Sequence, residues 1–84
     1  MGFFSLFRLT SEQKAIIARH DLLVPSAFVD DVRVKMAEQG ISEAFEKEYL
    51  SFTKKFGESM TVGHVVVCSD RACRAAGLPP IREF

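Results

Sequence analysis

The spacing of four aromatic residues constrains the fold of this chain more than any other feature. They are Phe45, Tyr49, Phe52 and Phe56. Their intervals of four, three and four residues place all four rings on one helical stripe about 60° wide. Ser42 favours a helix start and Gly57 a helix stop. We therefore predict an amphipathic helix between these two residues, with its aromatic stripe in the core.

Two further helices are predicted nearer the N-terminus. The first runs from about residue 11 to residue 20, or as far as residue 23, and it ends before Pro25 because the position preceding a proline disfavours helical backbone. The second opens at Pro25 and Ser26 and closes at Gly40, which supplies the left-handed backbone common after a helix. The second of these helices and the aromatic helix together supply a predicted core of Phe28, Val32, Met36, Phe45, Tyr49, Phe52 and Phe56.

A valine-rich segment follows Gly57 and is predicted to be a strand. Because four of its residues are β-branched valines, we assign residues 62–68 to one short strand. A short C-terminal helix is predicted over residues 70–76, closed by Gly77. A lone strand leaves backbone N–H and C=O groups unpaired. Its partner would be residues 3–7 or a second chain, unless the segment is helical.

The expected fold class is therefore mainly α, with three helices, one short valine-rich strand and a short C-terminal helix; a small α+β fold is the alternative. A chain of 84 residues, 48% of them hydrophobic, suffices for a single small domain over residues 1–84. Its eleven basic and eleven acidic residues cancel. Because phosphate contacts favour a basic excess, this balance disfavours nucleic acid as a partner.

The start of the sequence does not match a secretory signal, because its apolar stretch is short and lacks leading positive charge. The longest uninterrupted apolar run, residues 65–68, is far below the roughly 20 residues of a membrane span. Two cysteines are too few for a disulfide-stapled secreted domain. We therefore expect a cytoplasmic protein without a membrane span.

Cys68 and Cys73 are the only pair of residues with motif-like spacing. With His64, four residues upstream, and the more distant His20, they could offer a metal four nitrogen and sulfur ligands. Free cysteines, however, are often buried and behave as small hydrophobic residues. We therefore interpret both cysteines as structural and expect no metal or other cofactor.

The cysteines also lie in a segment with a family resemblance. Its sequence from His64 to Gly77 is HVVVCSDRACRAAG, preceded by Val24-Pro25, Gly40, Ala44, Ser51-Phe52 and Phe56. Over about residues 22–78 the chain resembles the first half of the thioredoxin-like 2Fe–2S ferredoxins, the small subunits of NADH dehydrogenases, NAD-reducing hydrogenases and NAD-linked formate dehydrogenases. The resemblance implies a strand ending at Cys68, with Cys68 and Cys73 as cluster ligands. The family uses a second cysteine pair that this sequence lacks, so a cluster would require a dimer that pools both pairs.

No catalytic constellation is visible in the sequence. Neither histidine lies in a motif with a serine or cysteine nucleophile, and there is no glycine-rich phosphate loop. Glu43, Glu46 and Glu48 fit the solvated face of a helix better than paired acid–base chemistry. We therefore do not expect an enzyme.

The hypothesis that remains is a small non-enzymatic protein–protein interaction or regulatory module that self-associates, as in a homodimer. Its candidate partner-binding residues are apolar or basic: Phe3, Phe4, Phe7, Val34, Leu50, Arg71 and Arg74. One alternative is an iron–sulfur or metal-binding electron-transfer remnant that uses Cys68 and Cys73 across a dimer. A second alternative is a small nucleic-acid-binding regulator that uses Arg71 and Arg74.

Overall fold

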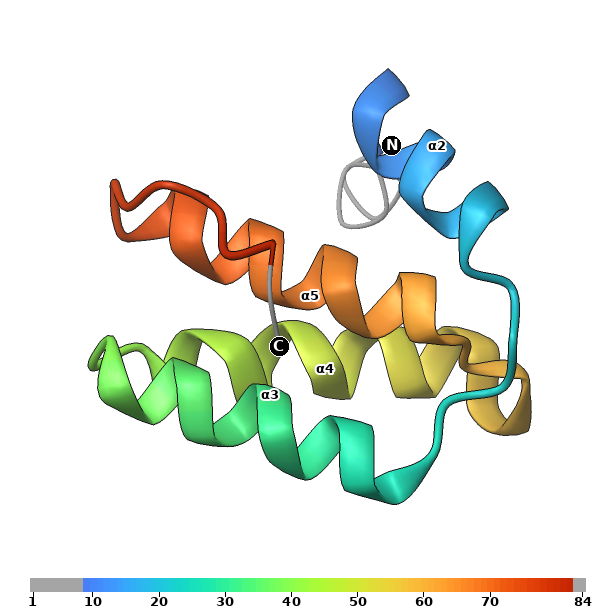
Figure 1. Cartoon of the computed structure of the whole chain (residues 1–84), viewed down its shortest axis with the longest axis horizontal. Helices are drawn as coiled ribbons and strands as arrows, with labels where there is room; N and C mark the ends of the chain where they lie inside the picture. Colours follow the sequence, from blue (N-terminus) through green and yellow to red (C-terminus); the bar gives the residue numbers. More distant parts are fainter. Residues whose placement is uncertain (1–8, 83–84) are drawn as a thin grey trace.

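The computed structural model describes residues 9–82, which form four α-helices joined by short connections (Figure 1). With the labels of Figure 1, the elements are α2 (Ser11–Arg19), α3 (Ser26–Glu38), α4 (Ser42–Phe56), the 3-10 turn η1 (Gly57–Ser59) and α5 (Val62–Ala75). The predicted mainly helical class is confirmed. Within residues 9–82 the only β-type pairing is an isolated antiparallel bridge between Leu23 and Thr61.

The predicted strand at residues 62–68 is wrong, because these residues form the first half of α5. Thr61 caps this helix: its Oγ1 accepts a hydrogen bond from the His64 N–H (3.2 Å), and His64 Nδ1 accepts one from the Thr61 N–H (3.0 Å). This reciprocal capping box satisfies two N–H groups that a helix start leaves open. A β-branched residue disfavours helix by only roughly half a kcal/mol. Capping and burial therefore outweigh the intrinsic preference of the valines.

The separate C-terminal helix predicted at residues 70–76 is also wrong, since it is the second half of the same helix α5. This helix is central. It lies between α2 on one side and α3 and α4 on the other (Figure 1). Nine of its fourteen residues are buried. The wrong prediction rested on the consecutive valines Val65, Val66 and Val67, and a short apolar run of this kind does not by itself separate a buried helix segment from a strand.

The core is built where α5 meets the helical hairpin of α3 and α4. Phe45 and Phe52, on the aromatic stripe of α4, are completely buried. Val32 and Met36 of α3 are buried beside them, whereas Phe28, Tyr49 and Phe56 are partly buried and pack against this core. The rings of Phe52 and Phe56 lie 5.8 Å apart. The aromatic stripe thus faces the interior, as the spacing of the four rings predicts.

Helix α2 packs against α5 and against no other helix of residues 9–82. It ends at Arg19, so its predicted extension to residue 23 is wrong. Beyond it the chain runs extended beside the start of α5. The N–H groups of Val62 and Gly63 donate to the carbonyls of Leu22 (2.9 Å) and His20 (2.8 Å). These bonds satisfy two further N–H groups at the start of α5. They stabilise a non-helical backbone in the linker between α2 and α3.

Candidate functional site

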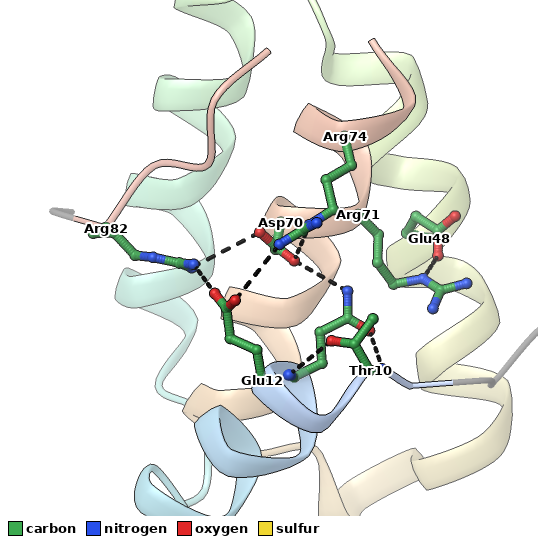
Figure 2. Close-up of polar contacts among 8 residues, drawn as sticks. Thr10, Glu12, Glu48, Asp70, Arg71, Arg74 and Arg82 are labelled. Carbon is green, nitrogen blue, oxygen red and sulfur yellow. Dashed lines mark hydrogen bonds and ion pairs between the residues drawn. The ribbon is translucent and has the colours of Figure 1, made fainter. Parts of the chain in front are cut away.

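A buried carboxylate is the most unusual polar feature of the described residues. Asp70, in the second half of α5, is only 1% exposed. Its Oδ2 accepts hydrogen bonds from Gln13 Nε2 (3.0 Å) and Arg74 Nε (2.9 Å), and Arg82 Nη1 lies 3.8 Å from Oδ1 (Figure 2). A buried charge is tolerated only when it is paired and hydrogen-bonded. Asp70 therefore links α5 to two other parts of the chain, α2 and the segment that follows α5.

Glu12 is the second carboxylate of this group. One of its oxygens forms an ion pair with Arg82, and the other lies 3.8 Å from Arg74 Nη2 (Figure 2). We call Glu12, Gln13, Asp70, Arg74 and Arg82 the Asp70 cluster. Two carboxylates and two guanidinium groups make it electrically neutral. It joins α2, α5 and the segment that follows α5.

The local sequence of α2 orients Gln13 for this role. Thr10 caps α2, and its Oγ1 accepts a hydrogen bond from the Gln13 N–H at 3.1 Å. The Gln13 Oε1 in return accepts the Thr10 N–H at 3.1 Å. Because the amide oxygen is engaged in the capping box, the amide nitrogen points to Asp70. One side chain thus starts α2 and also fastens it to α5.

A pocket opens beside the Asp70 cluster, between α2, α3 and α5. Its volume is about 370 Å³. The floor is apolar and the rim is charged or polar: the lining residues are Glu12, Ile16, Arg19, His20, Phe28, Val62, Val66 and Arg82. Such a combination of apolar walls with a few polar groups is typical of binding sites.

The charged groups on the rim are not equivalent. Glu12 and Arg82 neutralise each other within the Asp70 cluster. Arg19, in the last turn of α2, forms no ion pair with any residue of the described range 9–82. Among the described residues, Arg19 is therefore the one charged group of the pocket wall without an ion-pair partner.

Two exposed leucines lie in the linker that follows the pocket residue His20 in the chain. Leu22 is 75% exposed and Leu23 67% exposed, the highest values among the large apolar side chains of residues 9–82. Leu22 is bonded through its carbonyl to the N–H of Val62, a residue of the pocket wall. We call the pocket, together with the linker that carries these two leucines, the α2–α5 surface. Large apolar groups on a rim of polar residues are characteristic of interaction sites.

The structure distributes the predicted partner-binding residues over separate places. Val34 and Leu50 are each 56% exposed, on α3 and α4 respectively. Arg71 forms an ion pair with Glu48 of α4 (2.8 Å), and Arg74 belongs to the Asp70 cluster (Figure 2). Both arginines thus bind carboxylates of their own chain. The remaining candidates, Phe3, Phe4 and Phe7, lie outside the described residues.

The two cysteines lie in the interior of α5 and both are completely buried and free. Burial raises the pKa of the Cys68 thiol, with a smaller contribution from the charge of Glu48. The thiolate is the form that binds metals, so this environment opposes ligation. The resemblance placed Cys68 at the end of a strand, whereas it lies in the middle of a helix. Among residues 9–82, no three His, Cys, Asp or Glu side chains meet in a way that could hold a metal.

His64, the third candidate metal ligand, is engaged in contacts that stabilise the fold. Its ring is bonded to Thr61 and stacks on Phe56 with ring centroids 4.1 Å apart. Burial lowers the pKa of His64 below its ordinary value of 6.5. Since Nδ1 accepts the Thr61 N–H, a proton at Nδ1 would oppose that donor. The neutral ring is therefore part of the helix cap.

Sequence reasoning did not predict the Asp70 cluster or the pocket. The Thr10 capping box had a local signal, because a threonine followed three residues later by glutamine marks a helix start. The bond from Gln13 to Asp70, by contrast, joins positions 57 residues apart. The pocket combines residues from position 12 to position 82, and no local pattern indicates that they meet.

Comparisons with protein-family models, curated proteins and solved structures found no match to this chain. None of the helices formed by residues 9–82 combines the length and the apolar character that crossing a membrane requires.

Proposed function

We propose that this chain is a non-enzymatic protein-binding module and that it binds its partner through the α2–α5 surface. The observation that carries the proposal is the pocket of about 370 Å³ with an apolar floor, beside a linker that carries the two most exposed leucines of the described residues. Exposed apolar groups of this size lower the free energy of a complex when a partner covers them.

The charged groups beside the pocket support binding rather than catalysis. Glu12 and Arg82 are paired with each other, and Asp70 is buried under Arg74, Arg82 and Gln13. A general acid or base needs a side chain free to exchange a proton with a substrate. The Asp70 cluster instead fixes the position of α2 and so maintains the wall of the pocket.

The structure removes one reason for expecting self-association. An unpaired strand at residues 62–68 would have offered its edge to a second chain. In α5 the backbone groups of these residues are engaged within the helix and its cap. We therefore assign the α2–α5 surface to a different protein, and a second copy becomes a competing outcome of the experiments.

The proposal is tested by affinity capture from the source cells, quantified by mass spectrometry. The test variant is Leu22→Ser combined with Leu23→Ser. Its matched control is Val34→Ser combined with Leu50→Ser, because both pairs are exposed but the control pair lies on α3 and α4. We expect a partner that is retained by the wild type and the control and lost with the test variant.

Circular dichroism should show that all three proteins are folded, since only exposed side chains change. The proposal is wrong if the test variant captures the same proteins as the wild type in the same amounts. It is equally wrong if only the α3 and α4 variant loses the partner.

A further inference from the structure

We infer that the partner presents an acidic segment, in which a large apolar side chain enters the pocket and a neighbouring carboxylate pairs with Arg19. This inference rests on the proposed function and adds the chemistry of the partner. It rests on two observations: the residues at the floor of the pocket are apolar, and the charged residues on its rim are unequally paired.

The floor of the pocket specifies the apolar part of the ligand. Ile16 is buried, and Phe28, Val62 and Val66 are half-buried around the pocket. A volume of about 370 Å³ lies at the small end of the usual range for binding pockets, about 300–1,000 Å³. A pocket of this size admits one large side chain such as leucine or phenylalanine, whereas an extended apolar surface could not enter it.

The rim specifies the charge of the ligand. Both oxygens of Glu12 are already engaged, one by Arg82 and the other by Arg74. An incoming ammonium group would therefore find no free carboxylate among the described residues of the pocket wall and would be repelled by Arg19. An incoming carboxylate would find Arg19 without an ion-pair partner in the described residues. Complementary charge of this kind selects between partners and speeds their encounter.

Asp21 is the nearest acidic residue in the sequence to Arg19. It forms no ion pair with Arg19 and does not line the pocket. Within residues 9–82, no carboxylate therefore competes with a ligand for the positive charge of Arg19.

Three synthetic helical peptides provide the probes. They share one leucine-containing apolar face and carry glutamate, glutamine or lysine beside it. Each is titrated into the full chain at low ionic strength while backbone amide shifts are followed by NMR. We expect shifts at Ile16, Val62 and Val66, with the glutamate peptide binding about fivefold more tightly than the lysine peptide, the magnitude of one exposed ion pair. Salt should reduce the difference.

Two variants test whether Arg19 causes the preference for the glutamate peptide. Arg19→Gln should abolish the preference for glutamate while binding of the glutamine peptide persists. Lys14→Gln removes one exposed cation from the same helix but not from the pocket, and it should leave the preference unchanged.

The outcomes separate the two proposals. If none of the peptides shifts the pocket amides at millimolar concentration, the pocket does not bind apolar side chains and the proposed function fails. If the three peptides bind equally, the proposed function stands and the acidic partner is wrong. If the amides shift with protein concentration alone, and Leu22→Ser with Leu23→Ser abolishes this, a second copy occupies the surface and the inference is overturned.

Discussion

Gly63 shows how one residue can set the distance between two helices. A Cβ at this position would lie 2.7 Å from the Ile17 Cα and 3.0 Å from the carbonyl oxygens of Ile16 and His20. All three are backbone atoms, so no side-chain rotation relieves the contact. Only glycine lets α2 approach the start of α5 this closely.

We predict that Gly63→Ala destabilises the protein by about 1–3 kcal/mol, the usual cost of overpacking. This loss exceeds the gain of up to about 1 kcal/mol that alanine brings to a helix interior. Urea denaturation measures the change. Gly40→Ala is the comparison: its Cβ would meet open space but its φ of 72° is strained for alanine. Only Gly63→Ala should shift the amide resonances of α2, and a Gly63→Ala protein as stable as the wild type would contradict the close contact.

His64 makes the stability of the fold depend on pH. Its pKa is lowered by burial in the folded chain and has its ordinary value, 6.5, in the unfolded chain. Between these two pKa values the unfolded chain binds a proton that the folded chain does not. The contribution to the free energy of unfolding is therefore complete above pH 6.5 and is lost as the pH falls through the folded pKa.

We predict that His64→Gln flattens this dependence. Glutamine at the third position of a capping box can replace the imidazole as acceptor, as Gln13 does at the start of α2. Urea denaturation at a series of pH values is the measurement. His20→Gln removes the only other histidine and should keep the wild-type slope. An unchanged slope in His64→Gln would show that other groups cause the dependence.

The helix α4 anchors the core through the residues of its aromatic stripe. Phe52 is completely buried and contacts the rings of Phe56 and His64. We predict that Phe52→Ala reduces the free energy of unfolding by about 3–5 kcal/mol, as expected for a large aromatic side chain removed from a core. Leu50→Ala, on the exposed face of the same helix, should change it by less than about 0.5 kcal/mol. Urea denaturation that shows similar losses for the two variants would reject this orientation of α4.

The helix α2 is held differently, by α5 alone and by the Asp70 cluster. Asp70→Asn keeps the shape of the side chain but removes the charge that binds Arg74 and Arg82. We predict faster hydrogen exchange of the α2 amides by about tenfold, with little change in α3 and α4, since α2 opens locally when this link weakens. Glu48→Gln weakens the Arg71 ion pair on the other side of α5 and should leave α2 exchange unchanged. A uniform effect of Asp70→Asn on all helices would contradict local opening.

For the molecule as a whole, the burial of both cysteines predicts a protein without accessible thiols. We expect iodoacetamide to modify Cys68 and Cys73 only after unfolding, because both are buried and the raised pKa of Cys68 disfavours its reactive thiolate. Mass spectrometry with and without denaturant measures this.

Metal analysis of anaerobically purified protein tests the iron–sulfur alternative on the same material. Stoichiometric iron or zinc, together with loss of cooperative unfolding when either cysteine is replaced by alanine, would establish that alternative. We expect neither result, and Ala at both positions should cost only modest stability because a small apolar side chain remains.

The helices α3 and α4 could be recognised in the sequence because each contacts the core along one face. Their apolar residues, among them Val32, Met36, Phe45 and Phe52, repeat with the period of a helix, and this pattern is local. Gly40 and Gly57 marked their ends for an equally local reason, the positive φ that glycine tolerates.

The nature of α5 and the position of the α2–α5 surface depended on contacts between distant residues. Val65 and Val67 lie on different sides of a helix covered by its neighbours, so burial stabilises a conformation that β-branched residues only mildly disfavour. Gly63 meets Ile17, Gln13 meets Asp70, and Arg19 lines a pocket with Val66. No periodic pattern in the sequence marks these pairs. Their members are far apart in the chain and meet only when the whole chain packs.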